Sequence, residues 1–210
     1  MGVRPARIGL FGGAFDPPHN AHLALAQAVI AELKLDRLQV VPTGHAWHKE
    51  RALTDSALRL AMCQLAFAGM ARTRVDAREL RRAGPSYTAD TLHELHDENP
   101  LADLYLLIGT DQAAAFSTWH RASEVLQLAD LVIAVRQEPA AATPPVFDAA
   151  HPLPGLEPDP TRLHILRLAP IELSATAVRR RVAEGRSISH WTPPAVAAYI
   201  AHHHLYQTIA

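Results

Sequence analysis

Short, mostly apolar runs alternate with longer segments of helical periodicity along most of this chain. The runs have the length of β-strands and lie at 8–11, 38–41, 73–75, 104–108 and 131–135. Between them, apolar residues recur every three or four positions, as in amphipathic helices, at 23–33, 56–67 and 88–96. The runs 104–108 and 131–135 are continuously apolar, which is typical of strands buried on both faces. The alternation predicts an α/β fold with a Rossmann-like, doubly wound parallel sheet.

The helical segments also indicate which side chains enter the core. In segment 56–67, the face expected to pack on the sheet carries Leu58, Ala61, Met62 and Leu65. Near the end of the chain, Thr192 is a candidate cap for a last helix that has proline at its first position. We expect that helix to pack through Val196, Tyr199 and Ile200.

We expect residues 1–210 to form one domain, with the segment from about residue 171 forming a small helical subdomain. In that segment Ser174 is a candidate N-cap, the pattern is helical as far as Glu184, and Gly185 suits the left-handed position after a helix end. Residues 137–160 are rich in proline and alanine. That composition predicts a surface excursion and not a domain boundary.

Composition and charge narrow the class of protein. With 210 residues, 49% of them hydrophobic, the chain can bury one substantial core. Its 20 basic residues balance 21 acidic ones, so no overall field attracts nucleic acid or an anionic membrane. The sequence has no apolar run long enough to span a bilayer, no apolar core of a secretory signal, and one cysteine, which cannot form an internal disulfide. We therefore expect a cytoplasmic enzyme with a local binding site.

The most informative stretch joins the first apolar run to the first helical segment. Residues 12–22 read Gly-Gly-Ala-Phe-Asp-Pro-Pro-His-Asn-Ala-His. Gly12 and Gly13 allow the backbone to turn sharply and to approach a ligand closely. His19 and His22, three residues apart, are predicted to lie side by side on the first turn of the helix, where unpaired N–H groups and the helix dipole favour an anion. The pattern predicts a phosphate site.

The same residues have other interpretations. A glycine pair before a helix can be an ordinary tight turn, and two histidines at this spacing could bind zinc. A zinc site needs a third protein ligand, however, and Cys63 lies within an apolar run. We predict no dedicated metal site. Asp16 could orient the loop or the nucleotide, or could serve only in an Asx-turn.

A second group of candidate phosphate ligands lies near residue 174. Ser174 and Thr176 place two hydroxyls, and Arg179 a guanidinium, around one helix start. Such a set suits the triphosphate of a nucleotide. As an alternative, helix capping alone explains Ser174, and the neighbouring Arg180 and Arg181 are expected to be solvated or ion-paired.

Two loops in the middle of the chain carry candidate groups for a second substrate. The stretch 84–88, Gly-Pro-Ser-Tyr-Thr, leads into a helix, where free N–H groups and the Thr88 hydroxyl could bind a carboxylate. Trp119 follows the stretch 108–111, Ile-Gly-Thr-Asp, and could stack on a flat heterocycle. Each signal is weak alone, because aromatic residues are more often packed in a core and Thr88 could be only a helix cap.

Together these motifs resemble those of a known superfamily. Residues 12–22 are similar to the Gly-x-Phe-Asp-Pro-x-His-x-Gly-His signature of the nucleotidyltransferases, and residues 173–179 to their Ile-Ser-x-Thr-x-x-Arg motif. Ala14 stands where a hydroxyl residue is usual, and Ala21 where glycine is usual. With the stretches 84–88, 108–111 and 119–121, the chain resembles the bacterial nicotinate-nucleotide adenylyltransferases over residues 7–206.

The resemblance implies a set of site residues. The catalytic residues would be His19, His22 and Arg179. Contacts with ATP would come from Gly12, Gly13, Phe15, His19, His22, Gly109, Asp111, Ser174, Thr176 and Arg179. Contacts with nicotinate mononucleotide would come from Asp16, Lys49, Tyr87, Thr88 and Trp119. For Lys49, in the stretch 42–49 that resembles a family segment near the substrates, a solvated lysine on a loop is an equally good interpretation.

The resemblance implies adenylyl transfer from ATP to nicotinate mononucleotide, which yields deamido-NAD (nicotinate adenine dinucleotide) and pyrophosphate in NAD biosynthesis. Mg²⁺ is expected to arrive with ATP, held mainly by phosphate oxygens and water. The alternatives are another acceptor, nicotinamide mononucleotide or phosphopantetheine, or a nucleotide sensor without catalysis. The expected partners are the two nucleotides, with no nucleic acid and no membrane, and the sequence leaves open whether the protein is a homo-oligomer.

Overall fold

Six parallel strands form the centre of the computed structural model, which describes residues 4–44, 52–136, 148, 151–169 and 171–207. In chain order the strands are β1 (Arg7–Gly13), β2 (Arg37–Pro42), β3 (Thr73–Val75), β4 (Asp103–Gly109), β5 (Asp130–Arg136) and β6 (Leu163–Leu168). Their order across the sheet is β3-β2-β1-β4-β5-β6, and every neighbouring pair is parallel. This is the doubly wound Rossmann order, so the predicted fold class is confirmed.

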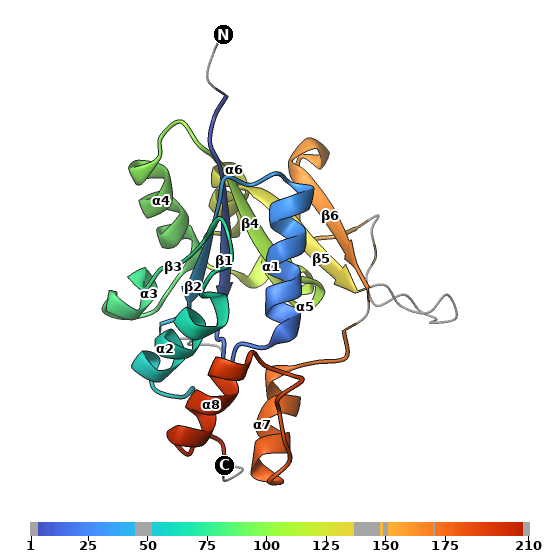
Figure 1. Cartoon of the computed structure of the whole chain (residues 1–210). Helices are drawn as coiled ribbons and strands as arrows, with labels where there is room; N and C mark the ends of the chain where they lie inside the picture. The colour runs from blue at the N-terminus through green and yellow to red at the C-terminus, as the bar shows by residue number, and fades with distance from the viewer. Residues whose placement is uncertain (1–3, 45–51, 137–147, 149–150, 170, 208–210) are drawn as a thin grey trace.

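Helices connect the strands and cover both faces of the sheet (Figure 1). The longer ones are α1 (Asn20–Glu32), α2 (Ser56–Phe67), α4 (Thr88–Glu98), α6 (Ala122–Leu128), α7 (Ala175–Ala183) and α8 (Pro194–His202). The shorter ones are α3 (Arg78–Arg81), α5 (Thr110–Ala114) and the 3₁₀ turns η1 (Phe116–Thr118) and η2 (Pro160–Arg162). A parallel sheet needs such crossovers, because its strands cannot be joined by tight hairpins.

The sheet separates two hydrophobic clusters, because side chains alternate between its faces along each strand. On one face, Phe11 and Val40 pack with residues of α1, α2, α7 and α8. On the other, Leu10 and Val41 pack with residues of α4, α5 and α6. The two C-terminal helices belong to the first cluster, since Val178, Val196 and Ile200 are part of it. The packing predicted for the last helix is confirmed, because Val196 and Ile200 are buried and Tyr199 is partly buried against the cluster.

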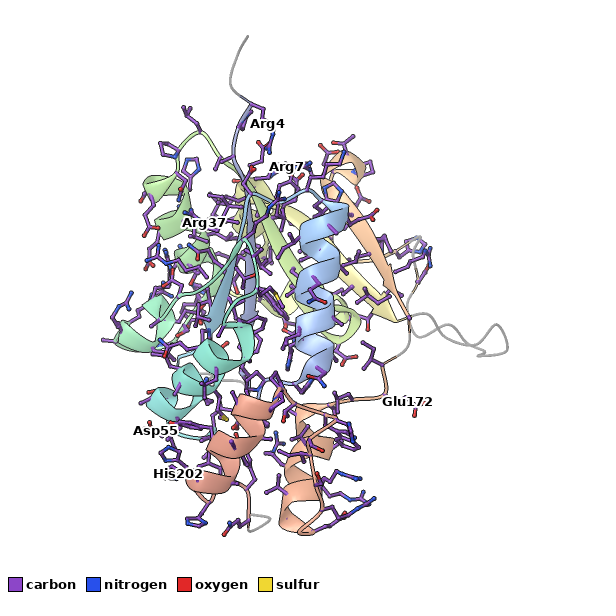
Figure 2. All side chains as sticks on the ribbon, in the orientation of Figure 1. Arg4, Arg7, Arg37, Asp55, Glu172 and His202 are labelled. Carbon is purple, nitrogen blue, oxygen red and sulfur yellow. The ribbon has the colours of Figure 1, made fainter. Side chains whose placement is uncertain are left out.

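One end of the sheet has the topology at which doubly wound folds bind ligands. The chain leaves β1 toward α1 on one face, while the crossover after β4 lies on the other, so the space beyond the ends of β1 and β4 is a topological switch point. Figure 1 shows α7 and α8 at this same end, where β1 leads into α1. In Figure 2 the labelled Arg4, Arg7 and Arg37 lie at the opposite end of the strands.

The structure adds elements that the sequence pattern did not predict. The edge strand β6 carries His164 and Arg167, and of its residues only Leu166 is buried, so it lacks the continuous apolar run of a central strand. Short helices such as α3 and α5 span too few turns to produce a clear periodicity. Within the predicted surface excursion, Leu153 is a core residue at 1% exposure, whereas positions 137–147 and 149–150 lie outside the described residues.

Three local predictions were wrong in detail. The buried face of α2 contains Arg59, Met62, Cys63 and Ala66, one residue away from the expected face, because the buried guanidinium of Arg59 hydrogen-bonds to the carbonyls of Ala14 and Thr54. The residue before α8 is Pro193, and the buried Thr192 instead donates its hydroxyl to the carbonyl of Ile188 at 3.4 Å.

The third concerns the first histidine. His19 is the N-cap of α1 in extended conformation and not a residue of its first turn, while His22 is the third helical residue. By contrast, the N-cap role of Ser174 and the left-handed Gly185 (φ +68°) are confirmed.

Candidate active site

Residues 12–22, which run from the last two residues of β1 to the third residue of α1, are called the histidine turn below. In the connection between the two elements, Phe15 has a positive φ of 47°, and the Asp16–Pro17 peptide bond is cis. Phe15 is 2% exposed, and its ring packs edge-on against Phe11 and Phe67. The hydrophobic core therefore holds the Phe15 side chain.

The two histidines form one unit. The His19 and His22 rings are stacked with their centroids 3.8 Å apart. The backbone N–H of His19 donates to Nδ1 of His22 at 3.1 Å, as in a capping box. Because Nδ1 accepts this bond, the neutral His22 ring carries its proton on Nε2, which makes Nε2 a donor.

The surroundings favour the neutral form of His22. Burial lowers the pKa of His22 well below its ordinary value of 6.5, and the neighbouring His19 lowers it further. The Phe15 ring lies edge-on to the His22 ring at 5.0 Å between centroids and contributes to this apolar environment. The structure thus holds a neutral N–H donor at the start of α1, where the helix N-terminus favours anions.

Asp16 ties the histidine turn to distant parts of the chain. Its side chain is 2% exposed, and its carboxylate accepts hydrogen bonds from the Tyr206 hydroxyl at 2.6 Å and from the Thr54 N–H at 3.3 Å. The buried Arg59 donates to the carbonyl oxygens of Ala14 at 3.0 Å and Thr54 at 2.9 Å. Burial lowers the pKa of Arg59, and the charge of Asp16 opposes that effect. The carboxylate is therefore one of the groups that hold the turn in place.

The second predicted phosphate group lies against the first. Arg179 on α7 donates to the backbone carbonyl of Asp16 at 2.8 Å and to the Thr176 hydroxyl at 3.0 Å. Ser174 caps α7 by accepting the Ala177 N–H at 3.1 Å. Two motifs that are more than 150 positions apart in the sequence are thus brought together by one guanidinium.

The predicted nucleotide loop after β4 starts at the neighbouring strand. Gly109 ends β4 next to β1 and precedes α5, which contains the exposed Asp111. A Cβ added at Gly109 would meet no heavy atom of the described residues within 4 Å. The loop is therefore open on the side where a ligand could approach, although no contact joins Gly109 or Asp111 to the histidines among the described interactions.

A second set of predicted residues meets on the α4–α6 side of the molecule. Tyr87, which precedes α4, stacks on His120, which precedes α6, with ring centroids 4.1 Å apart. Thr88 is the first residue of α4, so the alternative that it is only the helix cap is wrong. Trp119 is partly buried and packs on Phe116 with centroids 4.9 Å apart. We call Tyr87, Thr88, Trp119 and His120 the aromatic corner.

Ion pairs on the surface support the aromatic corner. Arg121 pairs with Asp90 on α4 and, at 3.5 Å, with Glu124 on α6. Glu124 also pairs with His93 of α4, and this interaction lowers the pKa of Glu124. These contacts link α4 to the start of α6, so they hold the Tyr87 and Trp119 loops next to each other.

The structure therefore places most of the predicted residues in two groups, with Gly109 and Asp111 on a separate loop after β4. One contains the histidine turn with Arg179, Ser174 and Thr176; the other is the aromatic corner. Asp16, predicted to contact the acceptor, lies in the first group, and its role toward a ligand stays a prediction. Lys49 lies outside the described residues.

Sequence reasoning missed the residues that hold the histidine turn. Arg59 could have been found, because it lies at helical spacing with Met62, Cys63 and Ala66, and a charged residue on an apolar helical face is unusual. Tyr206 gave no such signal, since nothing in its neighbourhood in the sequence points to a residue 190 positions away. Its hydroxyl has a pKa raised by burial and by Asp16, so it remains a hydrogen-bond donor.

Within the described ranges, no group of three or more histidine, cysteine, aspartate or glutamate side chains is arranged to hold a metal ion. The groups offered by the histidine turn and α7 are mainly N–H and O–H donors, which suit phosphate oxygens better than they suit a cation. The same part of the chain contains no helix with the length and apolar character needed to cross a membrane.

Comparison with known proteins gives the family of this chain. Residues 10–181 match the family model described as cytidylyltransferase-like. A protein of Albidiferax ferrireducens named as a probable nicotinate-nucleotide adenylyltransferase is 48% identical over 203 residues, covering 96% of this chain and 98% of its own. One of Chromobacterium violaceum with the same name is 42% identical over 210 residues, covering 96% and 99%.

Solved structures show the same fold at lower sequence identity. The Plasmodium falciparum nicotinic acid mononucleotide adenylyltransferase, determined in a complex with NaAD, has a TM-score of 0.74 and 17% identity, covering 96% of this chain and 98% of its own. A putative nicotinate-nucleotide adenylyltransferase of Vibrio parahaemolyticus has a TM-score of 0.67 and 18% identity, with 97% of each chain covered. The fold likeness thus extends over the C-terminal helices.

Proposed function

This chain belongs to the cytidylyltransferase-like family and, within it, to the nicotinate-nucleotide adenylyltransferases, and from that premise we propose how its two groups of residues divide the reaction. The enzyme transfers the adenylyl group of ATP to nicotinate mononucleotide and releases pyrophosphate. The histidine turn and the start of α7 bind the phosphates of ATP, and the aromatic corner binds the pyridine of the acceptor.

One observation carries this assignment. Arg179 joins the two phosphate-binding motifs by donating to the Asp16 carbonyl, at the switch point beyond the ends of β1 and β4. Ligands of doubly wound sheets bind at that point. A donor-rich site there fits a triphosphate, because each phosphate oxygen can accept several hydrogen bonds.

The transfer itself needs positioning and charge stabilisation more than proton transfer. A phosphate oxygen of nicotinate mononucleotide is already anionic near neutral pH, so it can attack the α-phosphorus of ATP without a general base. The bond from this phosphorus to the bridging oxygen breaks, and pyrophosphate leaves with that oxygen. His22 donates from Nε2 to a non-bridging oxygen of the α-phosphate, and His19 lies beside it.

The remaining donors hold the leaving group. Arg179 and the Thr176 hydroxyl already form a hydrogen-bonded pair at 3.0 Å, and Ser174 precedes the same helix. We assign them to the β- and γ-phosphates. Mg²⁺ would arrive with ATP and would supply further neutralisation of the phosphate charge.

The acceptor's pyridine fits the aromatic corner. Trp119 offers a ring for stacking, and the first N–H groups of α4, at Thr88 and the following residues, are donors suited to the nicotinate carboxylate. Nicotinamide mononucleotide lacks the carboxylate and carries an amide, which would need an acceptor as well as donors.

The first experiment measures pyrophosphate release with ATP and Mg²⁺, using nicotinate mononucleotide, nicotinamide mononucleotide and phosphopantetheine as separate acceptors. We expect kcat/KM to be highest for nicotinate mononucleotide. A higher value for either of the other acceptors would reject the assigned substrate. ATP binding without release for any of the three would identify a nucleotide sensor.

A further inference from the structure

A buried carboxylate on α3, outside every motif discussed so far, lies at the meeting point of two loops. Glu79 is 7% exposed. Its Oε1 accepts the Thr91 hydroxyl at 2.9 Å, and its carboxylate also accepts the backbone N–H of Gly44. Arg82 provides the nearby positive charge. Burial of a carboxylate carries a desolvation penalty, which the specific donors from two separate segments offset. Glu79 therefore makes a specific contact with both segments.

One of these segments is the chain that leaves β2. A Cβ added at Gly44 would lie 2.2 Å from the carbonyl oxygen of Glu79 and 2.7 Å from the hydroxyl oxygen of Ser86. Gly44 therefore packs its backbone directly on α3 and on the stretch 84–88. Only glycine allows this approach, because any side chain would displace the backbone of α3.

The other segment is the start of α4. Thr91 is fully buried, and its N–H donates to the Tyr87 carbonyl at 3.3 Å. Its hydroxyl accepts from Arg82 at 3.2 Å and donates to Glu79, so both functions of the hydroxyl are used. Arg82 is in turn paired with Glu94 at 2.6 Å. The chain of contacts leads from Gly44 through Glu79 and Thr91 to the backbone of Tyr87.

We propose that Glu79 is a positioning residue for the acceptor: by holding Gly44 and the start of α4 in one fixed arrangement, it sets the affinity for nicotinate mononucleotide without touching it. The inference rests on the proposed function, because it takes the Tyr87–Thr88 turn as the pyridine site. Glu79 joins that turn to the end of β2, whereas the surface ion pairs of the aromatic corner join it to α6 and the residue before it.

The network should affect the acceptor more than ATP. The backbone N–H of Thr43, next to Gly44, donates a hydrogen bond to the carbonyl of Gly13 in β1 at 2.8 Å. This contact extends the β1–β2 pairing independently of Glu79. The histidine turn is held by Arg59, Tyr206 and Arg179 instead. Loss of the Glu79 carboxylate would therefore leave the phosphate side in place while the Tyr87–Thr88 turn shifts.

The test uses steady-state kinetics of the full-length protein. Glu79→Gln keeps the shape of the side chain but removes its charge and one acceptor oxygen. We expect the KM for nicotinate mononucleotide to rise about tenfold, while the KM for ATP and kcat stay within about threefold. Glu98→Gln is the matched control, because the Glu98 carboxylate likewise links α3 and α4, through Arg78, but its side chain is 55% exposed. It should leave all three parameters unchanged.

A second pair of variants covers the case in which Glu79→Gln does not fold. Thr91→Val removes the hydroxyl at constant size and should raise the same KM, whereas Thr91→Ser keeps the hydroxyl and should restore it. An unchanged KM for nicotinate mononucleotide in the folded variants would overturn the proposal. Equal changes in both KM values, with a parallel fall in Tm, would also overturn it, because they indicate a purely structural role.

Amide hydrogen exchange separates this inference from the proposed function. In Glu79→Gln without substrates, we expect faster exchange both at Gly44 and at residues 87–91. Faster exchange confined to α3 would reject the coupling of the two segments. If the wild-type protein releases no pyrophosphate with nicotinate mononucleotide, the proposed function fails, and the exchange result then decides whether Glu79 joins the two segments.

Discussion

The histidine turn and the aromatic corner are held by different kinds of interaction. In the turn, Phe15 and Asp16 are each 2% exposed, and the holding groups come from α2, α7 and the C-terminal residues. In the corner, the supporting Asp90 and Arg121 side chains are 36% and 35% exposed. Buried hydrogen bonds are screened little by salt, whereas partly exposed ion pairs such as Asp90–Arg121 are weak and salt-sensitive.

The difference corresponds to different geometric demands. In-line attack at phosphorus loses rate steeply when a donor is displaced by about 1 Å, so the reaction centre benefits from a rigid, buried frame. Stacking on a flat ring tolerates small displacements, so the ion pairs that link the Tyr87 and Trp119 loops can stay on the surface, while the buried Glu79 and Thr91 hold the Tyr87–Thr88 turn itself. Four predictions test this division, from the largest expected effect to the smallest.

Replacing His22 should have the largest effect. His22→Ala removes the Nε2 donor, and we expect kcat to fall by about 10²–10³, with both KM values changed little, because the lost interaction acts on the transition state. Pyrophosphate release measures this. His96→Ala, at an exposed position on α4, is the control. A folded His22→Ala variant with near-normal kcat would remove His22 from the mechanism.

Replacing Trp119 should affect binding of one substrate. Trp119→Ala should raise the KM for nicotinate mononucleotide about tenfold, with a smaller change for ATP, because stacking on a heterocycle contributes about 1–3 kcal/mol. Trp119→Phe retains a flat ring and should recover most of the affinity. If Trp119→Ala weakens both substrates equally, the division between turn and corner is wrong at this residue.

The C-terminal contact with the histidine turn should have an intermediate effect. Tyr206→Phe removes the hydroxyl that donates a hydrogen bond to the Asp16 carboxylate. We expect kcat to fall about fivefold, with a loss of about 1 kcal/mol in the free energy of unfolding. Tyr199→Phe, on α8 against His203, is the matched control. An equal response of the two variants would show that the Asp16 contact has no special importance for the turn.

The smallest expected effect is on stability at low pH. The pKa of His22 is lower in the folded protein than its ordinary 6.5, so the unfolded chain binds a proton first as the pH falls. The free energy of unfolding should therefore decrease below pH 6.5 by up to about 1 kcal/mol per pH unit from this residue. Urea unfolding of the wild type and His22→Ala at several pH values measures it. Parallel curves would contradict the buried neutral state.

Much of this protein could be predicted from its sequence because the relevant information is local. The strand and helix periods, the glycines and histidines of residues 12–22, and the cap at Ser174 depend on neighbours in the chain. The edge strand β6 was not predicted, because a mostly unburied strand lacks a continuous apolar run. The histidine pair was recognisable because its spacing by itself places both rings at one helix start.

Only the tertiary structure showed what holds these groups in place. Arg59, Glu79 and Tyr206 act across 35 to 190 positions of the chain, on Ala14, Gly44 and Asp16. Their partners are backbone groups or buried carboxylates, and such pairings leave no pattern in a single sequence. The sequence by itself determined which chemistry is present, since that depends on residue types at short spacing. Folding decided where the donors stand, because burial and distance are properties of the packed chain.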